Sequence, residues 1–509
     1  MARRHRLTIG YKIFSIILVP TIYLIYINTL TLFIPNDTDS SASHPTDARF
    51  RKLLQAEPME PGGNKTINCT PPAIKEFPSD GLTREQRESG YIAIHFVIAI
   101  YMFLLLAIVC DDFFVPSIKK ICDKINVTED VAGATIMAAA SSSPELFINI
   151  VGTFVTEGDL GVGTIVGSAV FNILAVPACC GLFARQILNL EWWPVTRDTI
   201  AYTITVFLLI LTLRDGRVYW YEALILVFFY ILYILVMCCN RNIQGLLKRA
   251  TTMRRKYRNL SEKSPLLSSS VLVVSDLVKD TDFHIMESGQ EDETLEIVNM
   301  TNWPSSTCEK IWWMITWPIN LILLITIPDC RRSKLKSWYP LTFFMCIIWI
   351  ATTSYLVGWV ITVIGDTFKI PDSIMGLTFL AAGMSVPEAV SSVIVANQGH
   401  GAMGISNSIG SNVFDVLLCL GLPWFLKTAF FPTVPQKHYI IINSHGLVYS
   451  AVSLFSTLTV FYLSLLIGKF KLTRAVGITC LIMYVIFLAF ASVLELNMFF
   501  VVNLPICVH

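Results

Sequence analysis

Two glutamates stand directly after prolines inside apolar stretches of this chain. Glu145 lies in "AAASSSPELF", residues 138–147, and Glu388 lies in "AAGMSVPEAV", residues 381–390. A charged side chain at mid-membrane costs at least about 2.5 to 3.5 kcal/mol on insertion scales, so both glutamates should face water or an ion. A single glutamate of this kind is also explained as a protonated residue that is hydrogen-bonded to a neighbouring helix. Two at matching places favour a functional site.

The two stretches belong to one longer internal repeat. Residues 131–174 align without a gap with residues 374–417, at the constant offset of 243 positions that separates Glu145 from Glu388. Chance similarity between apolar helices would match Leu, Val and Ile, whereas most of the matches here are Gly, Ser, Pro and Glu. The identical pairs include Gly133/Gly376, Thr135/Thr378, Ser142/Ser385, Pro144/Pro387, Glu145/Glu388, Gly161/Gly404, Gly167/Gly410, Ser168/Ser411 and Phe171/Phe414. Such repeats are common in secondary transporters.

The second half of each repeat adds more oxygen-bearing side chains. Asn172 in "GSAVFN" and Asp415 in "GSNVFD" are equivalent, and each lies four residues after a serine, on the same helix face. Each proline also frees a backbone carbonyl one turn earlier, where small residues allow close approach. The candidate ligands are Glu145, Glu388, Asp415, Ser142, Ser385, Ser168, Ser411, Asn172 and Asn412, with the backbone near Ala138, Ala139, Ala381 and Ala382.

This candidate set contains only oxygen ligands, with no Cys or His. It therefore suits the hard cations Ca²⁺, Na⁺ or K⁺ rather than zinc or copper. One divalent and one monovalent ion together would neutralise the three carboxylates. We expect these inorganic cations as transported partners and no cofactor beyond them.

The elements that hold these residues are membrane helices. The chain has 509 residues, of which 54% are hydrophobic and 15% charged, and its apolar runs repeatedly reach the roughly 20 residues that a spanning helix needs. We therefore expect an all-α polytopic protein in a lipid bilayer. The net charge of +1 gives no sign of nucleic-acid binding, and the 13 cysteines show no zinc or redox spacing. A homodimer is one of the assemblies that the sequence allows.

The apolar runs predict ten core transmembrane helices in two sets of five. The expected spans are 91–110, 129–154, 160–183, 199–213 and 218–239, then 339–363, 373–397, 403–426, 444–467 and 474–496. The expected domains are an N-terminal signal peptide or anchor (1–35), a glycosylated extracellular segment (36–90), a first five-helix repeat (91–239), a disordered cytoplasmic loop (240–310), an interfacial helix with a basic linker (311–338) and a second five-helix repeat (339–509). A cleaved signal and an uncleaved anchor explain the N-terminal segment equally well.

Glycosylation sequons and basic residues predict the orientation. Asn36, Asn64 and Asn68 begin sequons, which puts residues 36–90 outside and the basic segment "SIKKICDK" (117–124) in the cytoplasm. The apolar segment 311–328 is followed by four basic residues, so we expect it to lie in the membrane interface, broken by Pro318. The second set of five helices then starts on the opposite side from the first, which makes the two repeats inverted.

The two repeats and several motifs around them resemble those of a known family. The two repeats resemble the alpha repeats of the cation/calcium exchanger superfamily, and "GTIVGSAVFNIL", "IPDSIMGLTFLAAG", "SNSIGSNVFDVL" and "GLPWFLKTAF" resemble its potassium-dependent sodium/calcium exchanger branch. The resemblance covers both five-span blocks. It implies an antiporter that exports Ca²⁺ together with K⁺ in exchange for Na⁺.

The resemblance also implies roles for particular residues. By it, calcium and sodium are bound by Glu145, Glu388, Ser142, Ser385, Asn172, Ala138 and Ala381, potassium by Asp415, Ser391 and Asn412, and further ion ligands are Ser141, Ser168 and Ser411. The chain departs from the family motifs, since it has Met384 where the family has Thr and Glu388 where the family has Asp. One hydroxyl is lost and one carboxylate reaches a methylene further, which leaves ion affinities and sodium stoichiometry open.

Three other functions fit parts of the pattern. A proton-coupled cation exchanger would use the same glutamates, and it would work without sodium. A calcium channel would need a selectivity filter from repeats of like orientation, and an intramembrane aspartyl protease would need a second aspartate facing Asp415. We expect no enzyme. The expected location is the plasma membrane, with endosomal, trans-Golgi or other secretory membranes as the alternative.

Overall fold

The computed structural model describes residues 73–125, 138–156, 158–184, 188–190, 192–238, 307–397, 401–431, 439–442, 444 and 446–498. Within these residues the chain is mostly helical, and nine helices are long and apolar enough to cross a membrane. The predicted N-terminal segment, the sequons at Asn36, Asn64 and Asn68 and nearly all of the predicted loop 240–310 lie outside the described residues.

The first block consists of helices joined by short turns. Its elements are η1 (Ala73–Glu76), α3 (Arg84–Gln86), η2 (Arg87–Tyr91), α4 (Ile92–Ile108), η3 (Val109–Phe114), α5 (Val115–Ile125), α7 (Ala138–Ser141), α8 (Ser143–Phe154), α9 (Leu160–Val170), η5 (Phe171–Ala175), α10 (Val176–Phe183), β1 (Leu188–Asn189), α11 (Trp192–Leu213), β2 (Arg217–Tyr219) and α12 (Trp220–Cys238). Several spans contain a π-helical turn, as at η3 and η5.

The second block has a similar order of elements. They are α14 (Thr307–Thr326), η6 (Ser333–Trp338), α15 (Tyr339–Thr367), α16 (Asp372–Met375), η7 (Gly376–Leu380), α17 (Ala381–Asn397), α18 (Gly401–Phe414), η8 (Asp415–Leu420), α19 (Gly421–Phe430), β3 (Tyr439–Ile441), α20 (Gly446–Ile467), β4 (Lys471–Leu472) and α21 (Arg474–Glu495).

Apolar length located most spans well, but their ends differ from the prediction. The span predicted at 160–183 is found at Leu160–Phe183, whereas the span predicted at 91–110 extends over Arg84–Cys122. Asp111 and Asp112 end the apolar run there without ending the helix, which continues through η3 into α5 with Ile118 and Cys122 buried. The basic segment 117–124 is therefore helical.

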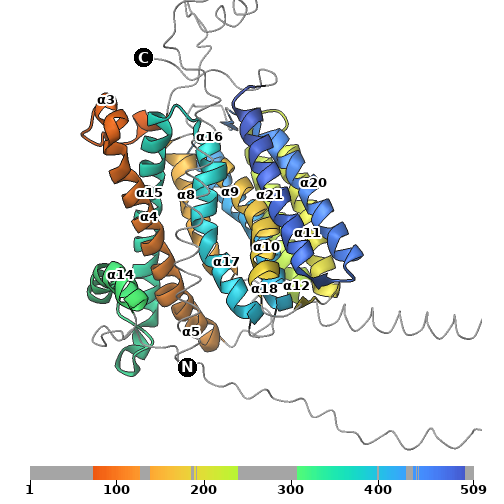
Figure 1. Ribbon diagram of the computed structural model, residues 1–509, viewed down its shortest axis with the longest axis horizontal. Coiled ribbons are helices and arrows are strands. Elements are labelled where there is room, and N and C mark those ends of the chain that lie inside the picture. The colour runs from red at the N-terminus through yellow and green to blue at the C-terminus, as the bar shows by residue number, and fades with distance from the viewer. Residues whose placement is uncertain are drawn as a thin grey trace, which may run out of the picture.

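The predicted break at Pro318 is wrong. α14 continues through Pro318 from Thr307 to Thr326. It is not among the candidate spans of the described residues. In Figure 1 it is seen nearly end-on, while α4 and α15 beside it are seen from the side. The interfacial location of this helix stays a prediction.

Two hydrophobic cores divide the helices. One core is built by α9 to α12 and α18 to α21, and the other by α4, η3, α5 and α15 with parts of α14 and α16. α17 contributes to both, since Ala389 and Val393 belong to the first core and Met384 to the second. Figure 1 shows α4 and α15 at the left, with α8 and α17 between them and the remaining helices. Polar residues on α8 and α17 therefore lie at the seam of two apolar bodies.

The helices α4 and α15 are tied together near both of their ends. At one end Arg87 Nη1 lies 3.4 Å from Asp366 Oδ2. At the other end Arg331 Nη1 lies 3.5 Å from Asp112 Oδ1, and Lys120 Nζ donates to the carbonyl of Cys330. Arg331 and Cys330 belong to the segment that leads into α15, so these contacts fasten η3 and α5 to that segment.

Two short antiparallel strand pairs connect the blocks. β1 pairs with β4, with Leu188 opposite Leu472, and β2 pairs with β3, with Val218 opposite Ile440. In each block one strand follows the third span and the other joins the fourth and fifth spans. Each strand that follows a third span therefore pairs with the strand that joins the fourth and fifth spans of the other block.

Close packing at the centre depends on glycine. α9 packs on η7 so tightly that a Cβ at Gly167 would clash with the Leu377 carbonyl oxygen, and one at Gly163 would lie 2.7 Å from the Ser373 oxygen. These positions bring the two repeats into backbone contact.

Candidate ion-binding site

The site residues come from the four segments that cross at the seam. Glu145 lies on α8 and Glu388 on α17, Asn172 lies in η5, and Asp415 is the first residue of η8. The side chains of Glu145, Asn172 and Asp415 are at most 1% exposed and that of Glu388 is 9% exposed. The charges of Asp415 and Glu388 both act on Glu145. The structure therefore brings the three predicted carboxylates into one electrostatic neighbourhood.

The two prolines act differently on their helices. In the first repeat the helix is interrupted at Ser142, with φ −92° and ψ 11°, and restarts with Pro144 in its first turn. In the second repeat α17 runs unbroken through Pro387 from Ala381 to Asn397. Proline lacks the N–H that an unbroken helix would use, and in the first turn no such bond is needed. A helix break thus accompanies only one of the two prolines.

Buried oxygen atoms without a hydrogen-bond partner mark the site. The Oγ atoms of Ser142 and Ser385, Oε2 of Glu145 and both carboxylate oxygens of Glu388, Oδ1 of Asn172 and Oδ2 of Asp415 are all buried and without such a partner. They form three pairs at the 243-residue offset, Ser142/Ser385, Glu145/Glu388 and Asn172/Asp415. Buried polar atoms are nearly always paired in folded proteins, so orphaned acceptors at matching positions indicate a place for a cation.

Other predicted ligands are already bonded within the protein. Asn172 Nδ2 donates to Asn412 Oδ1 at 3.1 Å, and Asn412 Nδ2 donates to the Ala169 carbonyl. Ser168 and Ser411 make matching bonds to the carbonyls three residues earlier, those of Ile165 and Ser408. These residues join the two repeats or the local helix, while keeping lone pairs for an ion.

The remaining predicted ligands differ in how deeply they are buried. Ser391 is exposed and donates to the Glu388 carbonyl at 3.0 Å, and Ser141 is half-buried. Ala381 is buried at the start of α17. Ala138 starts α7, and its side chain is outside the described set. Within the part of the chain that the structure describes, no three Asp, Glu, His or Cys side chains converge as a metal cluster, so hydroxyl, amide or carbonyl oxygens are needed to complete any cation site.

Sequence reasoning missed three residues that support the site. Cys419 Sγ contacts both the Ser142 carbonyl and Asp415 Oδ1, each at 3.9 Å, and Asn149 Nδ2 donates to the Cys419 carbonyl at 2.5 Å. Ser408 Oγ donates to the Asn172 carbonyl at 2.9 Å. The contacts of Cys419 fix η8 against α8 and the helix break at Ser142, and the Ser408 bond fixes α18 against η5. A lone Asn, Cys or Ser in an apolar run looks like ordinary packing, but the repeat offset pairs Asn149 with Ser392.

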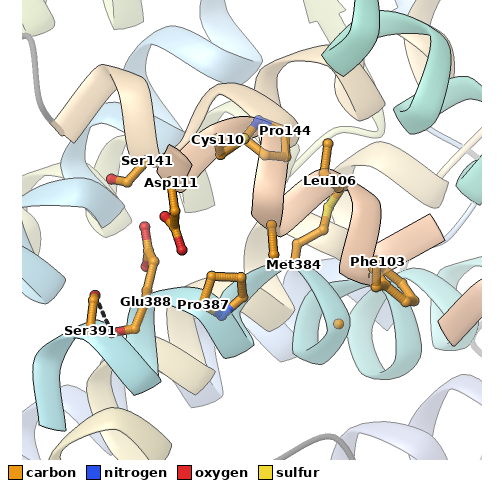
Figure 2. Close-up of a pocket in the computed structure, with 12 residues that line it drawn as sticks. Phe103, Leu106, Cys110, Asp111, Ser141, Pro144, Met384, Pro387, Glu388 and Ser391 are labelled. Carbon is orange, nitrogen blue, oxygen red and sulfur yellow. Dashed lines mark hydrogen bonds between the residues drawn. The ribbon is translucent and has the colours of Figure 1, made fainter. Parts of the chain in front are cut away.

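A pocket leads from the surface to Glu388. Figure 2 shows the Glu388 side chain facing Asp111 and Ser141, with Pro144 and Pro387 among the residues around the pocket. Asp111, in η3, is exposed, whereas Glu388 is nearly enclosed. The pocket therefore places an acidic residue that the sequence analysis did not select beside a predicted cation ligand.

The fold and the candidate site define a helical membrane protein with a buried cluster of oxygen-bearing side chains. A family model described as "Sodium/calcium exchanger protein" matches residues 95–239 and 338–493. Sodium/potassium/calcium exchanger 4 of Mus musculus is 37% identical over 568 residues, covering 90% of each chain. Sodium/potassium/calcium exchanger 3 of Homo sapiens is 37% identical over 580 residues, also covering 90% of each. The solved structure of the sodium-calcium exchanger NCX_Mj has 18% identity and a TM-score of 0.42, covering 78% of this chain and 98% of that one.

The chain belongs to the sodium/calcium exchanger family, within its sodium/potassium/calcium exchanger branch. The resemblance noted from the sequence motifs is thereby confirmed. The family is one of ion exchangers embedded in membranes, which makes the chain a transporter by class.

Proposed function

We propose that this protein is an antiporter that moves Ca²⁺ and K⁺ together in exchange for Na⁺. The observation that carries the proposal is the set of orphaned buried oxygens at three repeat-related pairs of positions. Desolvated acceptors of this kind are unfavourable without a cation, and hard cations prefer oxygen. The family relationship and the names of the related exchangers support the same ions.

Glu145 and Glu388 supply the charge that binds Ca²⁺ or, alternately, Na⁺, with Ser142, Ser385 and Asn172 as neutral ligands. Asp415 supplies the further charge for K⁺, with Asn412 and Ser391 as the neutral ligands that the family resemblance implies. Both glutamates come from segments next to prolines, and Asp415 comes from the π-helical turn η8. One divalent and one monovalent ion would neutralise the three carboxylates.

The ten core helices form two inverted five-helix repeats in this proposal. Strand pairing supports the inversion, since β1 follows the third span of one block and β4 joins the fourth and fifth spans of the other. Repeats of like orientation would put these two connections on opposite sides of the membrane. The reciprocal pair β2 and β3 supports the same conclusion on the other face.

Inverted repeats around one site are suited to alternating access. The proposed location is the plasma membrane, with a secretory or endosomal membrane as the alternative, and the homodimer stays a prediction. Calcium flux in vesicles that hold the full chain, with sodium and potassium varied independently, tests the function. The proposal predicts flux that needs sodium on one side and rises with potassium on the calcium side. Flux that persists without sodium would favour the proton-coupled alternative instead.

A further inference from the structure

Asp111 and its repeat counterpart have very different surroundings. The 243-residue offset, continued into the first helix of each block, pairs Asp111 in η3 with Ser354 in α15. Asp111 is exposed, but Ser354 is 0% exposed and its Oγ has no hydrogen-bond partner. The same place in the fold therefore holds an accessible acid in the first block and a buried hydroxyl in the second.

The residues beside the two glutamates also differ in exposure. Ser391 lies at the pocket beside Glu388 and is exposed, whereas its counterpart Ile148 beside Glu145 is fully buried. Ile148 packs so closely on α15 that a Cβ at Gly358 would lie 3.0 Å from its Cδ1 atom. Apolar packing thus seals the place around Ile148, whereas the pocket reaches from Asp111 to the buried Glu388 carboxylate.

The neighbouring acid, Asp112, faces elsewhere. Its carboxylate lies 3.5 Å from Arg331 Nη1, in the contact that fastens η3 to the segment before α15. Only Asp111 of this pair lines the pocket.

We propose that Asp111 is the entry residue of the ion pathway on the face of the membrane where α5 ends, where it attracts Ca²⁺ and Na⁺ and passes them to Glu388. The pathway on the other face has Ser354 at this place and so has no acidic entry residue. This proposal rests on the exchange function proposed above. A charge at a pathway mouth raises the local cation concentration and the rate of capture from its own side only.

The test measures exchange current of the full chain in excised patches of either orientation. Ca²⁺ is titrated at one face while the ions at the other face are held constant. Asp111→Asn should raise the half-saturating Ca²⁺ concentration at the α5 face about threefold or more, and the change should shrink as ionic strength rises. The half-saturating concentration at the opposite face should stay unchanged. Asp111→Glu should restore the wild-type value.

Asp112→Asn is the matched control, because it removes the same charge one residue further on, outside the pocket. Because Asp112 also ties η3 to the segment before α15, this variant is scored by the ratio of the half-saturating concentrations at the two faces, which should keep its wild-type value. If Asp111→Asn does not reach the membrane, Asp111→Ser provides the same test, since serine is the residue at the counterpart position.

Two results would overturn the proposal. An equal increase at both faces would make Asp111 part of the shared binding site, and no change at either face would remove it from the pathway. Absence of any sodium-dependent calcium current in the wild-type chain would be a separate result, because it would overturn the exchange function and this proposal with it.

Discussion

The two repeats share a sequence pattern but differ in conformation. The first is broken at Ser142 and buries Glu145 to 1% exposure, whereas the second continues through Pro387 and leaves Glu388 beside a pocket. Their glycines differ as well, since a Cβ at Gly167 would clash with backbone and one at Gly410 would meet only Tyr233 Oη at 3.5 Å. A repeated motif therefore specifies which chemical groups are present, but the packing around each copy decides which is open.

The largest effect is expected when either glutamate of the pair is neutralised. Glu145→Gln and Glu388→Gln remove ligand charge but keep side-chain volume, so each should lower calcium flux roughly tenfold or more. Vesicle flux, corrected for the amount of protein in the membrane, measures this. Glu222→Gln, which removes a carboxylate that accepts a hydrogen bond from the Tyr219 amide at the start of α12, is the control. Flux above about a tenth of wild type in both site variants would show that the repeats do not share one site.

The second prediction makes the repeats alike at the one position where their candidate ligands differ in charge, Asn172 and Asp415. Asp415→Asn places Asn at both equivalent positions and removes a charge, while the two glutamates remain to hold Ca²⁺. Calcium transport should continue at a reduced rate and lose its dependence on potassium. Flux at increasing potassium measures this, with wild type in parallel. A full potassium response in the variant would show that Asp415 is not the potassium ligand.

Alanine substitutions at the paired glycines Gly167 and Gly410 should change the stability of the protein by different amounts. Gly167→Ala would press against the Leu377 carbonyl and lie 2.6 Å from the Ala381 Cβ, so it should destabilise the protein by roughly 1 to 3 kcal/mol. Gly410→Ala has room, and in a helix it should be neutral or stabilising by up to about 1 kcal/mol. Thermal unfolding of the purified variants compares the two. Equal melting temperatures would mean that the packing asymmetry is absent.

The smallest effect is expected from the paired serines. Ser142→Ala and Ser385→Ala remove hydroxyls that make no hydrogen bond, so stability without ions should change little. The increase in melting temperature on adding Ca²⁺ should be smaller in each. Ser450→Ala removes another orphaned buried hydroxyl, in α20, and should leave the calcium effect intact. A calcium effect unchanged in both site variants would exclude these serines as ligands.

The sequence predicted spans and ligand types well because both follow from composition. Apolar length located α9 to α10 at Leu160–Phe183 to the residue, and the repeat offset selected Ser142, Glu145 and their partners. Apolar length failed at Asp111, because a helix continues past two acids when one face, with Phe113 and Phe114, stays buried. It failed again at Pro318, since a helix near neighbours tolerates a proline.

Conformational state could not be read from the repeat. Pro144 and Pro387 are equivalent in sequence, yet only the first lies next to a helix break. The contacts that distinguish them come from far along the chain, such as Cys419 against the Ser142 carbonyl. Asn149 and Cys419 were missed for the same reason, because their partners are separated from them by 270 residues.

The ties at both ends of α4 and α15 have a mechanical consequence. A sliding movement of one helix along the other would break the Arg87–Asp366 contact at one end and the Arg331–Asp112 contact at the other. The pair would therefore move as one body in any rearrangement that keeps these two contacts. Asp111 lies in one helix of the pair and Ser354 in the other, so such a rearrangement would carry both residues together.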